Sequence, residues 1–191
     1  MIQERVSRAM LLTRVQELYS AGTLDHAKTH DSELIQRYEL ACSEVSSSLG
    51  VLERREWSSY GQGFASFVES WFYRPEKPFE AEKYDSERYS YRGVSVVFSL
   101  LEPMFITYES EKRWSDDGDS GILPSLNTID NFNSTDTRTL NDSVCSIIRK
   151  NSIPQASKQT LDAPIDSEIK IESNMSFGEL RLFDAFFHWA D

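Results

Sequence analysis

The stretch from Tyr89 to Glu111, YSYRGVSVVFSLLEPMFITYESE, constrains the fold of this chain more than any other. Apolar residues recur at every second position from Val94 to Leu100, and this spacing places them on one face of a strand. Pro103 cannot donate to a strand ladder, so it interrupts the run. Residue types that favour strands resume from Met104 to Tyr108. The stretch therefore predicts a β-hairpin at the centre of a mostly antiparallel sheet.

A second β-rich stretch precedes the hairpin. Residues 57–74, WSSYGQGFASFVESWFYR, alternate between two sets of side chains and predict a strand, with a short helix as the alternative. Gly61 and Gly63 in this stretch suit a bulge or bend rather than a phosphate-binding loop. Residues 75–90 contain two prolines and many charges, so we expect a long polar loop there.

Three helices are predicted from apolar residues at helical spacing. They cover residues 2–20, Ser32 to Leu49 and Leu140 to Lys150. Gly22 and Gly50 are suitable ends for the first two helices. The short polar link between these two helices predicts an antiparallel pair. We expect the three helices to cover one side of the sheet.

The remaining segments are mainly polar. Residues 112–139 and 151–167 predict connections, and Ile169–Ile171 predicts a short strand. Ser176–Glu179 has the form of a capping box. The apolar segment that follows, LRLFDAFFHWAD, is expected to dock into the core.

Length and composition suit one α+β domain covering residues 1–191. Hydrophobic residues make up 39% of the chain and aromatic residues 12%, which is enough for a sizeable core. The predicted organisation is a helical pair in 1–50, a β-rich core in 57–111, and acidic loops, a helix and the docking segment in 112–191.

The formal net charge of -11 limits the partners that the chain can bind. It argues against nucleic acid and against anionic lipid, since both need basic surfaces, and it favours a basic protein partner. No stretch is long and apolar enough for a membrane span, and early charges disfavour a signal peptide. We therefore expect a cytoplasmic protein.

The acidic excess lies mainly in the second half of the chain. Residues 102–142 hold nine acidic and three basic side chains. Ordinary solubilising charge is one interpretation, and an acidic face matched to a basic partner is the other. The second predicts these partner-binding residues: Tyr108, Glu109, Glu111, Trp114, Asp116, Asp117, Asp119 and Phe132.

Sequence motifs for catalysis or metal binding are absent. No nucleophile elbow, phosphate loop or dinucleotide fingerprint occurs, so we expect no catalytic residue and no cofactor. His26 and His30 are read as part of a solvated linker, and the acidic turn at 116–121 departs from calcium-loop spacing, so no metal is expected. Cys42 and Cys145 are interpreted as buried free thiols, with a disulfide as the alternative.

Two apolar segments resemble segments of a known class of proteins. The segments VSVVFSLLEPMFITYE and ELRLFDAFFHWAD, in a small acidic α+β chain, are similar to segments of bacterial immunity proteins from toxin–immunity pairs. The resemblance implies a cytoplasmic inhibitor that binds the C-terminal domain of a cognate toxin. It assigns no subfamily and no binding residues.

A small enzyme or a regulatory adaptor is the alternative function. If the chain is an enzyme, His188 and Asp184 would be the first pair to test, because they lie four residues apart on a possible helix.

Overall fold

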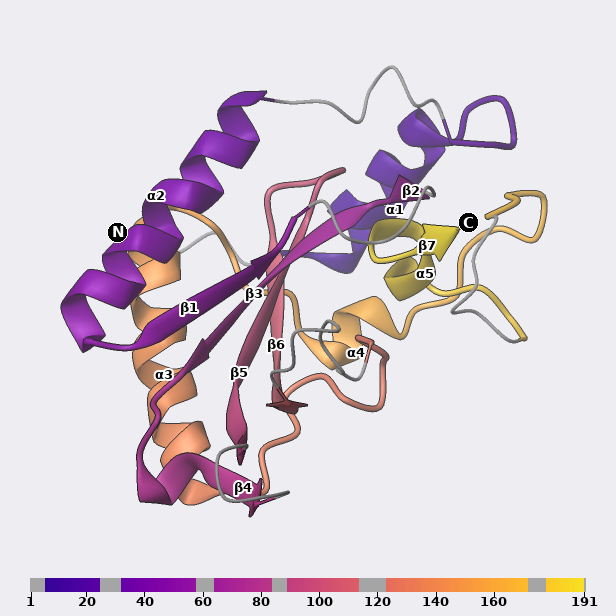
Figure 1. Cartoon of the computed structure of the whole chain (residues 1–191). Helices are drawn as coiled ribbons and strands as arrows, with labels where there is room; N and C mark the ends of the chain where they lie inside the picture. The colour runs from indigo at the N-terminus through magenta and orange to yellow at the C-terminus, as the bar shows by residue number, and fades with distance from the viewer. Residues whose placement is uncertain are drawn as a thin grey trace.

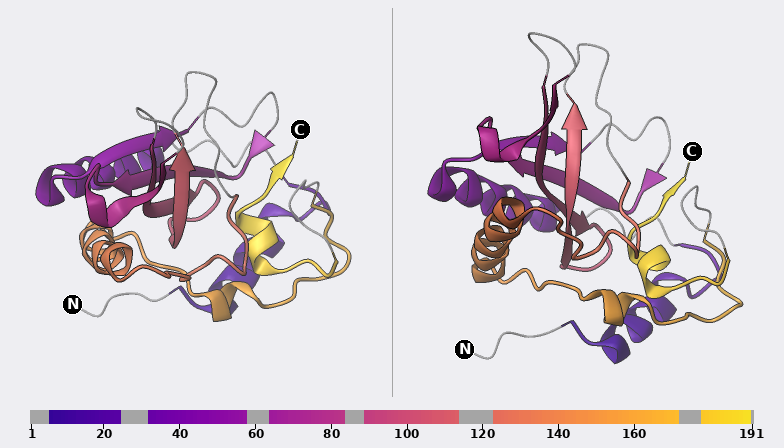
Figure 2. Two further views of the ribbon diagram at one scale, coloured as in Figure 1. Left: turned by 60° about the horizontal axis from the view of Figure 1, so that its bottom comes forward. Right: turned by 90° about the horizontal axis from the view of Figure 1, so that it is seen from below.

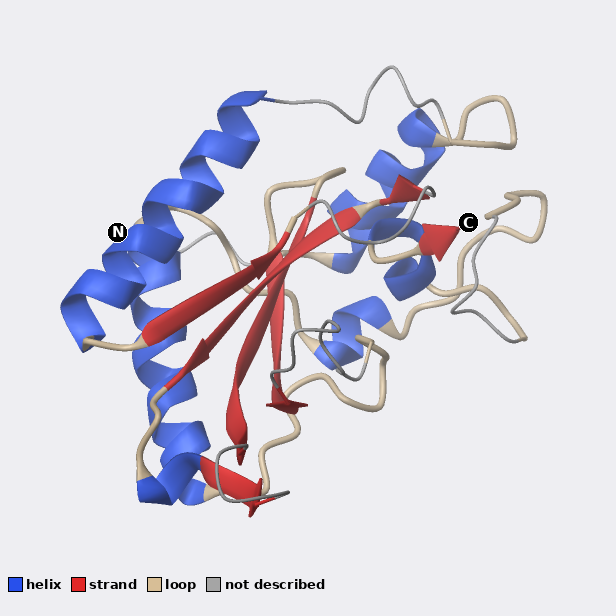
Figure 3. Cartoon of the chain, in the orientation of Figure 1, coloured by secondary structure: helices blue, strands red, loops and turns tan. Residues whose placement is uncertain are grey.

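The computed structural model describes residues 6–24, 32–57, 64–83, 89–113, 123–171 and 178–190. The helices are α1 (Arg8–Leu18), α2 (Ser32–Leu49), α3 (Thr135–Lys150), α4 (Lys158–Leu161) and α5 (Leu182–Phe186), with a short 3-10 helix η2 (Lys77–Phe79). The strands are β1 (Leu52–Glu56), β2 (Phe64–Ala65), β3 (Phe67–Tyr73), β4 (Glu80–Lys83), β5 (Tyr89–Ser99), β6 (Phe105–Arg113) and β7 (Trp189–Ala190). The chain has the predicted α+β fold, with helices around an open, mostly antiparallel sheet (Figures 1 and 3).

The main sheet has five strands with β5 at its centre. β3 and β4 pair with successive parts of β5, from Phe67 opposite Ser99 to Lys83 opposite Tyr89. β6 pairs along the length of β5, so it occupies the other edge of that strand. β1 lies beyond β3, and all of these strand pairs are antiparallel. β2 and β7 form a separate two-stranded sheet.

The predicted hairpin is confirmed as β5 and β6. Its register runs from Ser90 opposite Arg113 to Phe98 opposite Phe105, and the chain turns between Leu100 and Met104. The strand predicted in residues 57–74 is confirmed as β3, whose side chains are buried on both faces.

Two helical layers cover the two faces of the sheet (Figures 1 and 2). α2 and α3 pack on the face that carries Val68, Val96 and Phe105. α1, α4 and α5 pack on the opposite face, over Phe67 and Val97. Successive strand residues point to opposite faces, so the same strands supply both hydrophobic cores.

This layering corrects the prediction that α1 and α2 form a pair on one side of the sheet. The two helices belong to different hydrophobic clusters on opposite faces, and α2 packs beside α3 instead. The guanidinium group of Arg37 on α2 donates to the carbonyl groups of Asn151 and Ser152, just after α3. The Asn151 amide in turn donates to Glu44 of α2 at 2.8 Å. These contacts fix the α2–α3 pair.

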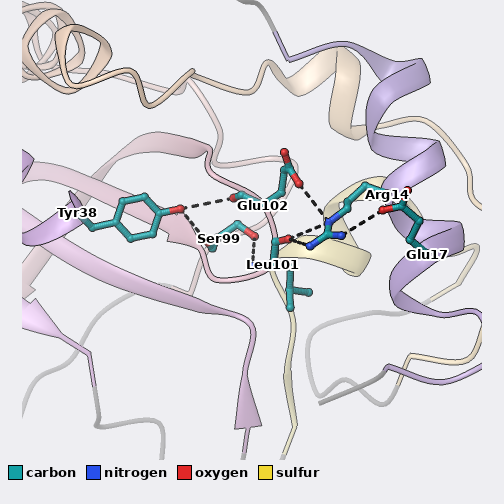
Figure 4. A network of polar contacts seen from close by, with 6 residues as sticks. All are labelled: Arg14, Glu17, Tyr38, Ser99, Leu101 and Glu102. Atoms are coloured by element: carbon teal, nitrogen blue, oxygen red, sulfur yellow. Dashed lines mark hydrogen bonds and ion pairs between the residues drawn. The ribbon is translucent and has the colours of Figure 1, made fainter. Parts of the chain in front are cut away.

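The turn between β5 and β6 is held from both layers (Figure 4). The hydroxyl of Tyr38 on α2 donates to the carbonyl of Ser99 at 2.6 Å. From the other layer, Arg14 on α1 lies 3.2 Å from the Glu102 carboxylate and donates to the carbonyl of Leu101 at 3.4 Å. The turn therefore connects the two helical layers through the end of the hairpin.

Short elements occupy several segments that were predicted as polar connections. η2 and β4 lie within residues 75–90, and β4 extends the sheet. α3 begins at Thr135 rather than at Leu140, because the Ser134 hydroxyl accepts from the amide of Asp136 at 3.2 Å and caps the helix. α4 forms within residues 151–167, and Ile169–Ile171 forms no strand.

The C-terminal segment docks into the core, as predicted. Phe186 and Phe187 are fully buried, and the Tyr19 hydroxyl of the α1 end donates to the carbonyl of Ala185 at 2.9 Å. The predicted capping box at 176–179 lies partly outside the described residues. α5 is capped instead at Arg181, whose amide donates to the Asp184 carboxylate at 2.7 Å.

Among the helices that the structure describes, none combines the length and the apolar character needed to cross a bilayer.

Candidate functional site

A polar and aromatic group of side chains lies on the sheet face that also carries α1. The strand register places Trp71 of β3 beside Ser95 of β5, and Ser95 beside Tyr108 of β6. Neighbours at a spacing of two residues along β3 and β6 share this face. We call the following residues the sheet-face cluster: Glu69, Trp71, Ser95, Tyr108, Ser110 and Lys112.

Glu69 and Lys112 form an ion pair inside the sheet-face cluster. Lys112 Nζ lies 3.1 Å from Glu69 Oε1, and each side chain is 4% exposed. The Ser95 hydroxyl donates to the same oxygen at 2.5 Å and the Tyr108 hydroxyl donates to it at 3.4 Å. Ser110 Oγ lies 2.6 Å from Ser95 Oγ. Hydrogen bonds to charged groups are stronger than neutral ones, so this network ties β3, β5 and β6 together.

Trp71 covers the backbone of the neighbouring strand. Its ring stacks on Tyr73 with 4.2 Å between centroids. A Cβ atom on Gly93 would lie 2.4 Å from Trp71 Nε1 and 2.6 Å from the carbonyl oxygen of Phe72. Position 93 therefore needs a glycine because the indole approaches the strand too closely for any side chain. Trp71 is 1% exposed, and its Nε1 has no hydrogen-bond partner in the part of the chain that the structure describes.

The chemistry of the sheet-face cluster is that of an internal ion pair. A serine nucleophile needs a base that accepts its proton, and histidine is the commonest such base. The Ser95 hydroxyl instead faces a carboxylate already bound to Lys112, and both residues are almost completely buried. A substrate in the solvent does not reach these atoms in this structure. Within the described ranges, no three His, Cys, Asp or Glu side chains are grouped to hold a metal ion.

The two cysteines, Cys42 of α2 and Cys145 of α3, pack against the opposite face of the sheet. Cys42 Sγ is 3.4 Å from Ser70 Oγ, and Cys145 Sγ is 4.0 Å from Thr107 Oγ1. The register puts Ser70 and Thr107 on either side of Val96, so they are about 10 Å apart across two strand spacings. Both thiols are free, which confirms the sequence interpretation.

Burial makes both thiols unreactive. Desolvation raises the pKa of Cys42 to about 12 and the pKa of Cys145 to about 12. The thiolate is the nucleophilic form of cysteine, and it is scarce at neutral pH when the pKa is this high. Neither cysteine is therefore a candidate nucleophile.

The aromatic residues predicted to anchor a partner are placed in the core where they are described. Tyr108 is fully buried in the sheet-face cluster, and Phe132 is 6% exposed and packs among the residues beneath α3. Both rings therefore pack in the core in this structure, and their predicted contact with a partner stays a prediction. Trp114 lies outside the described residues, as do Asp116, Asp117 and Asp119.

The two predicted glutamates of β6 have different environments. Glu109 is half-buried and accepts from the amide of Ser134 at 3.0 Å and from the Thr137 hydroxyl, so it holds the start of α3. Glu111 is exposed and accepts from the Ser90 hydroxyl at 2.5 Å. Of the predicted partner-binding residues that are described, Glu111 is the one with an exposed side chain.

Asp184 and His188, the pair considered for an enzyme, do not share a helix face. α5 ends at Phe186, and the backbone of His188 continues toward β7, where its amide donates to Ser66 Oγ at 2.8 Å. The carboxylate of Asp184 accepts from the amide of Arg181. Both residues are buried and contribute to the docking of the C-terminal segment. His26 and His30 lie outside the described residues.

Sequence reasoning missed the sheet-face cluster, although one signal pointed to it. Glu69 is the only charged residue of β3, whose other members are aromatic residues, Val68 and Ser70. A charge inside a strand that is apolar on both faces predicts a buried partner of opposite sign. The partner itself was not predictable, because Lys112 comes 43 positions later at the polar end of β6.

Comparisons with protein-family models, with curated proteins and with solved structures find no match to this chain.

Proposed function

We propose that this chain is a cytoplasmic immunity protein that binds and neutralises the C-terminal domain of a cognate interbacterial toxin. The observation that carries the proposal is the formal net charge of -11 on an α+β chain that buries two hydrophobic cores. An excess of this size attracts a basic partner over long range and accelerates the encounter. The resemblance of the hairpin and C-terminal segments to immunity proteins supports the same function.

The arginines neutralise only part of the acidic charge. Arg37, Arg74 and Arg138 donate to backbone carbonyl groups. Other arginines pair with carboxylates, as Arg14 does with Glu17 and Arg55 with Glu53. Because the chain holds 31 acidic and 20 basic residues, acidic side chains remain in excess.

The proposed mechanism is occlusion of a basic active-site cleft. Toxins that act on nucleic acid, on NAD, on nucleotides or on proteins in the cytoplasm suit an inhibitor of this kind, and many substrates of these classes are anionic. A protein surface rich in carboxylates competes with such substrates for the same cations. Inhibition then requires binding alone and no chemistry by this chain.

Co-expression with the toxin domain tests the proposal. The probe is the C-terminal domain of a large secreted protein encoded directly upstream of this chain, expressed from an inducible promoter. We expect growth arrest with the toxin domain alone, growth with both proteins, and a stable complex in size-exclusion chromatography. An unrelated toxin domain serves as the specificity control. Growth arrest in the presence of the folded chain, without a complex, would contradict the proposal.

A further inference from the structure

The outward face of α2 is exposed among the residues that the structure describes. α2 has 18 residues and is about 27 Å long at 1.5 Å per residue. Its buried side chains, from Leu34 to Val45, all face the sheet. Its opposite side consists of exposed residues, which are Glu33, Gln36, Glu39, Leu40, Ser43, Glu44 and Ser47.

Leu40 is the apolar residue at the middle of this outward face. It is 68% exposed, which is the highest exposure of any large hydrophobic side chain in the described residues. Its helix-surface neighbours at spacings of three and four are Gln36, Arg37, Ser43 and Glu44. An amphipathic helix has polar residues on its solvent face, so a leucine at this position departs from the pattern that the rest of α2 follows.

The charges around Leu40 have one sign on the solvent side. Glu33, Glu39 and Glu44 are exposed carboxylates of α2, and Glu44 also accepts from the side-chain amide of Asn151. Arg37 is the single basic residue of the helix, and its guanidinium group is bound to carbonyl groups beyond α3. A partner that complements this face needs cationic side chains around an apolar recess. Interfaces of this kind have an apolar centre and a charged rim that excludes water.

We propose that the outward face of α2 docks onto the basic toxin domain, with Leu40 buried at the centre of the contact and the carboxylates at its rim. The inference rests on the proposed function and names the surface that performs it. It names other residues than the predicted Trp114, Asp116, Asp117 and Asp119, which lie outside the described residues.

Binding kinetics of matched variants test this surface. Leu40→Ala removes the anchor at an exposed helix position, where alanine favours the helix, so the fold is kept. Leu52→Ala is the control, because Leu52 is 48% exposed but lies on β1 and faces the opposite side of the sheet. Asp116→Asn/Asp117→Asn/Asp119→Asn tests the acidic segment. Each variant is captured on a sensor surface, and dissociation of the toxin domain is followed at two salt concentrations.

The expected result is dissociation about tenfold to hundredfold faster for Leu40→Ala and unchanged for Leu52→Ala. Glu39→Lys is expected to slow association, mainly at low salt, because rim charges act on the encounter. Wild-type kinetics for both Leu40→Ala and Glu39→Lys would overturn the inference. If the acidic-segment variant alone loses binding, the interface lies there and the proposed function stands. If the wild-type protein itself does not bind, the proposed function fails.

Discussion

The two faces of the main sheet are buried by different kinds of contact. Beneath α2 and α3, β5 presents Val94, Val96 and Phe98, which belong to a large apolar cluster. On the opposite face, Phe67 beneath α1 and α5 is followed two positions later by Glu69, which pairs with Lys112. The first face depends on non-directional packing, and the second depends on a directional network.

This difference predicts which of the two faces tolerates amino-acid substitutions better. An apolar core loses stability in proportion to the volume removed and accepts similar side chains. A buried ion pair is strongly coupled, because loss of one partner leaves the other charged and unpaired in a medium of low polarity. The sheet-face cluster is therefore expected to be the more sensitive of the two regions.

The largest effect is expected when the ion pair is broken from one side. Lys112→Met leaves the Glu69 carboxylate buried without its cation, which should lower the free energy of unfolding by about 3–5 kcal/mol. Urea denaturation followed by circular dichroism measures the change. The double variant Glu69→Leu/Lys112→Met replaces both charges with apolar groups and should recover most of the loss. A double variant that is as unstable as the single one would mean that the cluster is not a coupled pair.

A smaller effect is expected at the glycine beneath Trp71. Gly93→Ala places a methyl group where only 2.4 Å separates the new atom from the indole nitrogen, so the ring must move. We expect a loss of about 1–3 kcal/mol, typical of overpacking. The near-ultraviolet circular dichroism of the Trp71–Tyr73 stack should change at the same time. An unchanged spectrum and unchanged stability would show that the indole is not held as described.

A conservative truncation on the face beneath α2 and α3 should lower the free energy of unfolding by a smaller amount. Ile148 of α3 is fully buried, and Ile148→Val removes one methylene without exposing a polar group. The expected loss is about 0.5–1.5 kcal/mol in urea denaturation. A loss as large as that of Lys112→Met would contradict the view that the apolar face is the more tolerant one.

The smallest effect concerns the turn that both layers hold. Burial raises the pKa of Glu102, and the nearby Arg14 opposes the shift. Because the folded-state pKa is the higher one, the stability from this carboxyl group is fully present below about 4.5 and is lost as pH rises through the folded pKa. The free energy of unfolding of the wild-type protein should therefore decline slightly as pH rises above about 4.5, and Glu102→Gln should remove this decline. Tyr38→Phe, on the apolar side of the same turn, should leave the pH dependence unchanged.

The sequence predicted those parts of the fold that depend on local periodicity. The hairpin, β3, and α2 from Ser32 to Leu49 are at the predicted positions, because the apolar spacing decides them. β1 was not predicted, since LERRE has no alternation and becomes a strand only by pairing with β3. The partner of α2 was not predicted either, because the Arg37 contacts beyond α3 span 114 positions.

The candidate sites were less predictable than the fold. Tyr108 lies on β6, whose free edge accepts backbone hydrogen bonds from the segments around Asp130 and Ala156. The sequence alone did not predict that its ring would be buried. The pairing of Glu69 with Lys112 depends on the registers of β3, β5 and β6 together. Leu40 was not among the predicted site residues, and its exposure became informative only when the packing of α2 was known.

The central proposal is that this protein acts through its surface, while the buried polar network serves the fold. The most direct test measures dissociation of the proposed toxin partner from two variants side by side, Leu40→Ala and Glu69→Leu/Lys112→Met, with folding of each verified by circular dichroism. The account predicts faster dissociation for Leu40→Ala and wild-type dissociation for the double variant. Wild-type dissociation for Leu40→Ala, together with loss of binding by the folded double variant, would contradict it.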